Sequence, residues 1–183
     1  MQPEAWLDVF RDLAIQIQGK VASLSGTLQA RREIRVGAGG DTTTWIDQQA
    51  EEIILCRLLS LHGQGENFTL ISEELGVKEF GPGGPYLLVD PIDGSLNAKR
   101  GIPFFSTSFA LVEGETLSGT RAGLVINLAN GDQFWAARGR GSFRNGCPLQ
   151  TQGSERLEIL AYEANRPPSD LAILSPLLPF AVR

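Results

Sequence analysis

One stretch, Leu87–Asn97, constrains the fold more than any other part of this chain of 183 residues. Tyr86 to Val89 is an apolar run of strand length, which predicts a buried strand. Pro91 lacks the backbone N–H that a sheet ladder needs, so we expect the strand to end at Asp90. The chain should therefore turn at its first carboxylate.

The residues after this turn place more polar groups near the same point. Asp93 follows Asp90 by three positions, and Gly94 allows a backbone conformation that a Cβ disfavours. Ser95 is a suitable N-cap for a helix that starts there. We therefore expect two carboxylates and several free backbone N–H groups to face one point.

Such a turn suits hard cations that hold a phosphate. Magnesium prefers carboxylate and carbonyl oxygens, and a helix N-terminus beside them offers an anion pocket. The competing interpretation is an ordinary turn, because Asp-Pro and Asp-Gly are common turn dipeptides. Five specified letters, each near ~5% of average usage, recur by chance about once in a few million positions, which favours the functional interpretation.

The string Asp90-Pro91-Ile92-Asp93-Gly94-Ser95-Leu96-Asn97 resembles the signature of the inositol monophosphatase-like, magnesium-dependent, lithium-sensitive phosphatases. Thr44-Trp45-Ile46-Asp47 resembles the T-x-x-D motif of this superfamily, and Ile71-Ser72-Glu73-Glu74 resembles its acidic strand end. The Gly37–Asp41 stretch and the Asn97–Phe104 run are most similar to the archaeal fructose-1,6-bisphosphatase branch.

The resemblance implies an α+β fold, the layered αβαβα sugar-phosphatase fold. Only its N-terminal α/β half and the start of the second half are expected here: a metal-binding domain over residues 1–155, and the start of a second αβ layer over 156–183. The family's late second-metal aspartate has no counterpart before the chain ends at Arg183. Either a fragment or a natural truncation explains this ending, and apolar residues such as Leu177 and Phe180 near it should bury against something absent.

The resemblance also implies roles for single residues. Asp47 and Ser95 would be the catalytic pair that activates water. Glu73, Asp90, Asp93 and the Ile92 carbonyl would hold two or three Mg²⁺ ions. Asp93, Gly94 and Ser95 would bind the substrate phosphate. Because two adjacent acids on an extended chain point to opposite sides, only Glu73 of the Glu73–Glu74 pair should face the metals.

A glycine-rich loop, residues 37–40, precedes Asp41 and cannot hold a regular element without cost. It is either a plain connector or, as the resemblance implies, a lid that brings Asp41 and Arg35 toward the metals and the phosphate. Asp41 would then be a third-metal or lid residue.

Flanking patterns predict the scaffold. Residues 4–30 have helical periodicity with Trp6 and Phe10 in the core, and residues 46–61 form a second amphipathic helix. Phe104 to Val112 reads as a strand buried on both faces, followed by an antiparallel meander to residue 146 with Asn-Gly turns.

Composition excludes some function classes. A net charge of −5 with 16 basic residues argues against nucleic-acid or membrane-surface binding, and no apolar run approaches the ~20 residues of a membrane span. The N-terminus lacks the basic flank of a signal peptide, so we expect a cytoplasmic protein. Cys56 and Cys147 have no metal-type spacing; Cys56 should be buried, and both thiols reduced.

Together with the resemblance, these observations predict a magnesium-dependent phosphatase of inositol monophosphate or fructose 1,6-bisphosphate. The resemblance also implies a homodimer that acts on small molecules. Three alternatives stay open: a 3′(2′),5′-bisphosphate nucleotidase of the same superfamily, a non-catalytic remnant acting as an interaction module, and a purely structural cation site.

Overall fold

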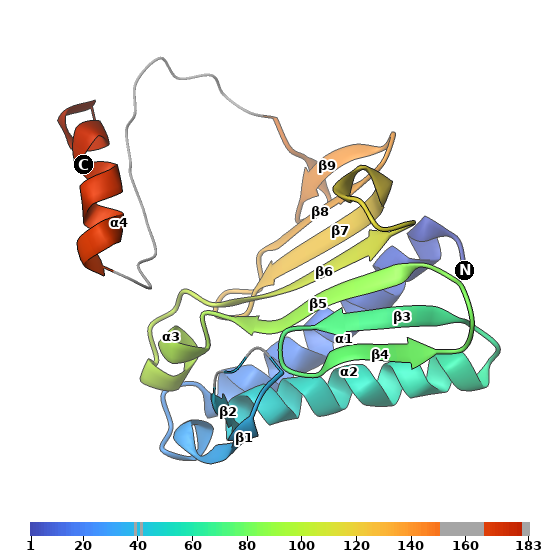
Figure 1. The fold of residues 1–183 in the computed structure, drawn as a ribbon, viewed down its shortest axis with the longest axis horizontal. Coiled ribbons are helices and arrows are strands. Elements are labelled where there is room, and N and C mark those ends of the chain that lie inside the picture. Colours follow the sequence, from blue (N-terminus) through green and yellow to red (C-terminus); the bar gives the residue numbers. More distant parts are fainter. Residues whose placement is uncertain (39, 41, 151–166, 181–183) are drawn as a thin grey trace. The chain divides into compact units, whose positions relative to one another are not determined.

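The computed structural model describes residues 1–38, 40, 42–150 and 167–180, in two compact units, Met1–Leu149 and Gln150–Arg183. The first unit contains an eight-stranded sheet in the order β10-β9-β8-β7-β6-β5-β3-β4 (Figure 1). Its strands are β3 (Phe68–Ser72), β4 (Gly76–Phe80), β5 (Tyr86–Asp93), β6 (Ser106–Val112), β7 (Thr120–Asn127), β8 (Gln133–Ala137), β9 (Gly141–Arg144) and β10 (Cys147–Pro148). The β3–β5 pair is parallel, and the other neighbours are antiparallel.

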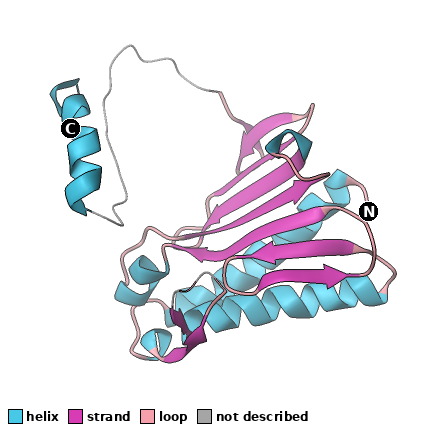
Figure 2. Ribbon diagram, viewed as in Figure 1, coloured by secondary structure: helices cyan, strands magenta, loops and turns pink. Residues whose placement is uncertain are grey.

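Two long helices, α1 (Pro3–Leu24) and α2 (Trp45–Gly63), cover one face of this sheet (Figure 2). Their apolar stripes form the core with alternate residues of the strands. Trp6 packs edge-on against Phe68, and Phe10 stacks on Phe109 at a centroid distance of 5.1 Å. Full burial of such side chains contributes about 1.5–3 kcal/mol each. The expected core role of Trp6 and Phe10 is confirmed.

The first helix is shorter than the periodicity predicts. It ends at Leu24 rather than continuing to residue 30, because Gly26 adopts a left-handed conformation, with φ 75°. The amide of Gly26 then donates to the carbonyl of Ala98, which ties the helix end to α3 (Ser95–Arg100). A short 3₁₀ turn, η1 (Gln29–Arg31), follows. Tertiary contact therefore sets this boundary.

Strand β5 does not end at Asp90, so this expectation is wrong. The strand runs to Asp93, and its pairing with β6 shifts register between Asp90 and Asp93. Pro91 lies inside this irregularity, where its missing N–H costs no regular ladder bond. The Pro91 carbonyl instead accepts a hydrogen bond of 2.7 Å from the Thr107 hydroxyl.

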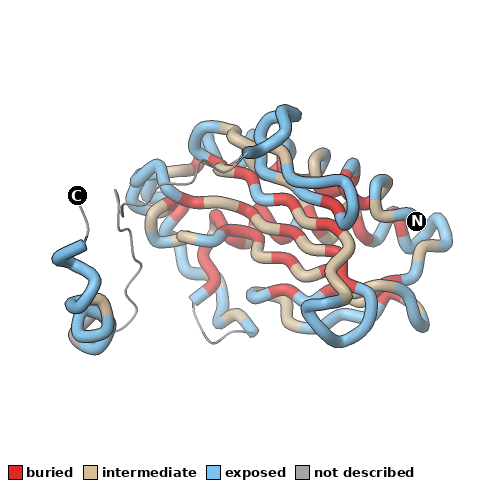
Figure 3. Tube along the Cα trace, turned by 90° about the horizontal axis from the view of Figure 1, so that it is seen from above, coloured by how far each residue is buried: buried red, intermediate tan, exposed pale blue. Residues whose placement is uncertain are grey.

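The expectation that β6 is buried on both faces is also wrong. Phe109 and Leu111 are buried beneath the helices, whereas the intervening Ser108 and Ala110 are only partly buried. Alternation of this kind continues on β5 and β7 (Figure 3), because within the first unit the helices cover the sheet from one side. We call the opposite side the open face. The predicted meander itself is confirmed from β6 through β9.

A separate two-stranded sheet pairs β1 (Glu33–Val36) with β2 (Thr42–Thr44) at the N-terminus of α2. We call it the β1–β2 hairpin. Its outer strand is largely exposed, whereas Thr43 and Thr44 are buried. The hairpin is therefore attached to the unit mainly through β2.

In the second unit, the described residues form α4 (Pro167–Leu174) and the 3₁₀ segment η3 (Ser175–Phe180). Leu177 and Phe180 are exposed there.

Another 3₁₀ turn of the first unit, η2 (Leu117–Gly119), joins β6 to β7. Both cysteines are free thiols as expected, but Cys56 is exposed rather than buried because it falls outside the core stripe of α2. No helix among the described residues is long and apolar enough to cross a membrane.

Candidate active site

The turn from β5 into α3 carries most of the predicted site. Gly94 is the N-cap of α3, with φ 83°, and Ser95 is the first helical residue. The expected N-cap was Ser95, so the cap lies one residue earlier. A Cβ at Gly94 would stand 3.1 Å from the Phe104 carbonyl oxygen, which explains the need for glycine in both conformation and space.

This double constraint predicts the effect of Gly94→Ala. We expect destabilisation by about 1–2 kcal/mol from the left-handed conformation alone, with a further loss from the contact to Phe104. Gly83→Ala is the matched control, because Gly83 has φ 71° but nothing within 4 Å of its virtual Cβ. Urea denaturation of both variants measures the difference. Equal destabilisation of the two variants would mean that the contact to Phe104 contributes nothing to the loss of stability in Gly94→Ala.

Asp90 and Glu73 come together because their strands are parallel neighbours. Ser72 at the end of β3 pairs with Val89 of β5, so Glu73 and Asp90, which follow these two residues, lie at the same end of the parallel pair. Burial raises the pKa of Asp90 to about 7, and the charges of Glu73 and Asp93 add to the effect. A hydrogen bond from the Ile92 backbone opposes it. The three carboxylates therefore crowd one another.

The remaining residues of the turn vary in exposure. Asp93 is exposed, with the Ser106 hydroxyl 3.5 Å from its carboxylate, and the Ile92 side chain is buried in the core. Asp90 directly follows Val89, whose side chain points under the helices, so Asp90 emerges on the open face.

Glu73 and Glu74 diverge as expected. They occupy the three-residue turn between β3 and β4, where Glu73 is exposed and Glu74 is partly buried. The Glu74 carboxylate accepts a hydrogen bond from the Thr43 hydroxyl. Burial raises the pKa of Glu74, and the charge of Asp47 adds to this. Glu74 thus turns toward the β1–β2 hairpin and leaves Glu73 beside Asp90.

Asp47 is buried in the first turn of α2. Its carboxylate accepts hydrogen bonds from the Thr44 amide, at 2.8 Å, and from the Thr44 hydroxyl, at 2.6 Å. Among the described residues, the Ser95 hydroxyl makes no hydrogen bond to Asp47, and the hydroxyl that contacts this carboxylate is that of Thr44. The pairing of Asp47 with Ser95 therefore stays a prediction.

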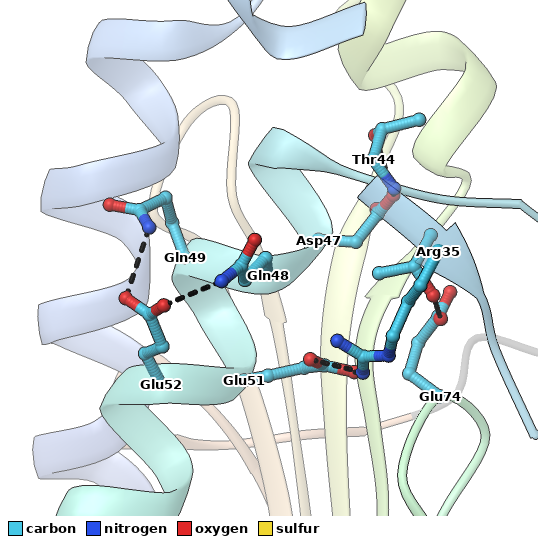
Figure 4. Close-up of polar contacts among 9 residues, drawn as sticks. Arg35, Thr44, Asp47, Gln48, Gln49, Glu51, Glu52 and Glu74 are labelled. Atoms are coloured by element: carbon cyan, nitrogen blue, oxygen red, sulfur yellow. Dashed lines mark hydrogen bonds and ion pairs between the residues drawn. The ribbon is translucent and has the colours of Figure 1, made fainter. Parts of the chain in front are cut away.

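Arg35 does not extend toward Glu73, Asp90 and Asp93, which together we call the acidic turn. Its guanidinium binds both carboxylate oxygens of Glu51, at 2.8 and 2.7 Å (Figure 4). The Glu51 side chain is 3% exposed, and burial raises its pKa although Arg35 acts in the other direction. Sequence reasoning missed Glu51; the available signal was an acid one helical turn after Asp47. Asp41 lies outside the described residues.

A pocket of about 430 Å³ lies beside this ion pair. Its lining residues are Arg35, Gln48, Glu51, Glu52, Leu55, Glu74, Leu75 and Lys78. Lys78 pairs with Leu70, so the pocket is on the helix-covered face, whereas Asp90 is on the open face. The pocket is therefore separate from the crowded carboxylates.

The donor chemistry of the acidic turn fits a divalent cation. Glu73, Asp90 and Asp93 supply hard oxygens whose mutual repulsion a cation would relieve, as the raised pKa of Asp90 indicates. Within the described ranges, no group of three acidic, histidine or cysteine side chains is already arranged to hold a metal ion. The carboxylates have thus been brought near one another without forming a finished coordination shell.

Known proteins with related sequences provide independent information. The model of the inositol monophosphatase family matches residues 4–174. A fructose-1,6-bisphosphatase/inositol-1-monophosphatase of Methanothermobacter thermautotrophicus is 36% identical over 163 residues, covering 84% of this chain and 57% of that protein. A bifunctional NADP phosphatase/NAD kinase of Methanocaldococcus jannaschii is 34% identical, over 70% of this chain and 26% of that protein.

The fold agrees with these sequence matches. The crystal structure of an inositol monophosphatase–fructose 1,6-bisphosphatase superposes with a TM-score of 0.80 at 25% identity, covering all of this chain and 67% of that one. The present chain thus spans little more than half the length of the curated relative from Methanothermobacter. The resemblance deduced from the Asp90–Asn97 string is confirmed, and the chain belongs to the inositol monophosphatase family.

Proposed function

We propose that this chain is the N-terminal, metal-binding part of a magnesium-dependent phosphomonoesterase that hydrolyses inositol monophosphate, fructose 1,6-bisphosphate or both. The crowding of Asp90 by Glu73 and Asp93 is the observation that carries the proposal. The relatives named for both activities support this choice of substrates.

In this proposal, Glu73, Asp90, Asp93 and the Ile92 carbonyl hold two or three Mg²⁺ ions. Bound magnesium would lower the pKa of water and offset phosphate charge. Asp93 and the backbone N–H groups of Gly94 and Ser95 orient the phosphate group, since the first amides of a helix lack partners within it. Asp47, buried and held by Thr44, is the base that accepts a proton from the attacking water, and the Ser95 hydroxyl lies between that water and Asp47 in this proposal. Asp41 is kept as a third-metal or lid residue.

The test is phosphate release from both substrates with magnesium and with a chelator. We expect release that depends on magnesium. A folded sample that binds magnesium at these carboxylates but releases no phosphate would contradict catalysis by this chain and favour a structural cation site or an interaction module.

A nucleotide phosphate is the second candidate substrate. The specific observation is the relative named as a bifunctional NADP phosphatase/NAD kinase, which is almost as similar as the first. Adenosine 3′,5′-bisphosphate and NADP, tested beside fructose 1,6-bisphosphate and inositol 1-phosphate, separate the substrate classes. Dimerisation and a cytoplasmic location stay predictions of the family resemblance.

The raised pKa of Asp90 predicts a pH dependence. The ordinary pKa of this carboxyl is 3.8. At pH values between 3.8 and about 7, Asp90 of the metal-free folded state therefore keeps a proton that it has lost in the unfolded chain. The Asp90 contribution to stability is therefore greatest in acid and declines as the pH rises through this window. Because magnesium competes with that proton, it should raise the melting temperature more at about pH 8 than at about pH 6. Melting curves with magnesium and with a chelator measure this.

Asp90→Asn provides the control for this pH effect, because it removes the titrating carboxyl. The difference between the two pH values should shrink in the variant. A magnesium-induced shift that is equal at both pH values in the unaltered chain would contradict the crowding of Asp90.

A further inference from the structure

We propose that Thr43 is a positioning residue, which holds Glu74 against the β1–β2 hairpin and thereby sets where Glu73 stands beside Asp90. The inference rests on the proposed metal site and deepens it. Among the described residues, no hydrogen bond joins the Thr43 side chain to Glu73, Asp90 or Asp93, so its effect on them would pass through the β3–β4 turn.

The contact between Thr43 and Glu74 is well buried on the hairpin side. Thr43 is 0% exposed, and its hydroxyl donates to the Glu74 carboxylate. The same hairpin makes a second bond to this residue, because the Ala38 amide donates to the Glu74 carbonyl at 3.1 Å. Side chain and backbone of Glu74 are thus both fixed by one element.

The backbone at Gly37 leaves the space that the Glu74 carboxylate occupies. A Cβ at Gly37 would overlap the Glu74 carboxylate and lie 3.0 Å from the Thr43 hydroxyl oxygen. Gly37 is not among the glycines with positive φ. Space for Glu74, rather than backbone freedom, is therefore what glycine provides at this position.

The short turn transmits this constraint to Glu73. Only residues 73–75 connect β3 to β4, and Ser72 and Gly76 on either side are paired in the ladder. With Glu74 fixed, Glu73 has little backbone freedom, and its carboxylate stays close enough to Asp90 to raise the pKa of that carboxyl. Without the contact, the turn can relax, and the crowded carboxylates can move apart.

Strand β2 thereby joins two parts of the proposed site. Thr43 fixes the β3–β4 turn, and its neighbour Thr44 holds Asp47 at the start of α2. Adjacent residues of an extended strand point in opposite directions, so one short strand serves both. Supporting hydrogen bonds of this kind around a metal site commonly change affinity by about 10–100-fold when removed.

The experiment compares magnesium affinity, measured by titration calorimetry, for three variants of the full 183-residue chain. Thr43→Val removes the hydroxyl and should weaken magnesium binding about tenfold. Thr43→Ser keeps the hydroxyl and should restore the affinity. Thr42→Val makes the same chemical change at the exposed neighbouring position and should leave the affinity unchanged.

Urea denaturation in chelator separates positioning from loss of fold. Thr43→Val with unaltered magnesium affinity would overturn the inference. If Thr43→Val does not fold, Gly37→Ala tests the same contact, because the added Cβ displaces the Glu74 carboxylate. Unaltered magnesium affinity in Gly37→Ala would also overturn the inference.

Failure of the proposed function has a different signature. In that case the unaltered chain binds no magnesium, or binds it equally after Glu73→Gln, whatever the residue at position 43.

Discussion

Asp93→Asn should reduce magnesium-dependent phosphate release by at least about a hundredfold while the fold survives. Loss of one carboxylate ligand removes part of a metal contribution worth several kcal/mol, and about 3 kcal/mol corresponds to roughly a hundredfold in rate. Because Asp93 is exposed and adds to the repulsion on Asp90, its neutralisation should not destabilise the metal-free chain. Phosphate release and chelator-treated melting curves measure the two effects.

Glu73→Gln should give the same result, since Glu73 raises the pKa of Asp90 in the same way. The matched control is Asp8→Asn, because Asp8 is an exposed acid on α1 that pairs with Arg11, far in sequence from the acidic turn. Near-normal turnover in either acidic-turn variant would remove the assignment of that carboxylate to the site.

Arg35→Met should cause a clear loss of stability. The substitution leaves the Glu51 carboxylate buried without its cation, and such a charge costs several kcal/mol in a fully buried setting. Because the Arg35 side chain is 38% exposed, water screens the pair, and we expect a discounted loss of about 2 kcal/mol. Urea denaturation measures it.

The loss of stability caused by Arg35→Met should depend on pH. Burial already raises the pKa of Glu51, and removal of Arg35 should raise it further. A raised carboxyl pKa favours the folded state in acid, so Arg35→Met should approach the unaltered chain as the pH falls. The double variant Arg35→Met/Glu51→Gln should recover most of the loss near neutral pH. A double variant as unstable as the single one would show that packing, rather than charge, holds the hairpin.

Local patterns in the sequence predicted much of the candidate site. The apolar run before Asp90 indicated β5, the β-rich run before Glu73 indicated β3, and the glycine after Asp93 indicated a sharp turn. The divergence of Glu73 and Glu74 was expected from an extended chain, whereas the structure places both residues in the turn after β3, where the contact with Thr43 directs Glu74. The strands and the sharp turn depend on near neighbours, which the sequence contains directly.

Features that depend on distant partners were not predictable in this way. Strand β5 continues past Pro91 because β6 accommodates the irregularity, and Cys56 is exposed because the core stripe of α2 passes on another side. The sequence did not distinguish Glu51 from the other acids of α2, because its ion-pair partner Arg35 lies on another element, β1. Each outcome is decided by packing between segments far apart in the chain.

The open face of the sheet has a consequence for how the acidic turn responds to its surroundings. Glu73 and Asp93 are exposed, so dissolved ions reach the space around them. At about 1 M salt the screening length in water falls to about 3 Å, so salt weakens even short-range repulsion between exposed charges, whereas Asp90 is partly shielded from this screening. Ionic strength should therefore relax the repulsion from Glu73 and Asp93 but leave the burial of Asp90 intact. Simple salts and magnesium thus act on different parts of the same cluster, and the ionic medium becomes a second control on its charge state.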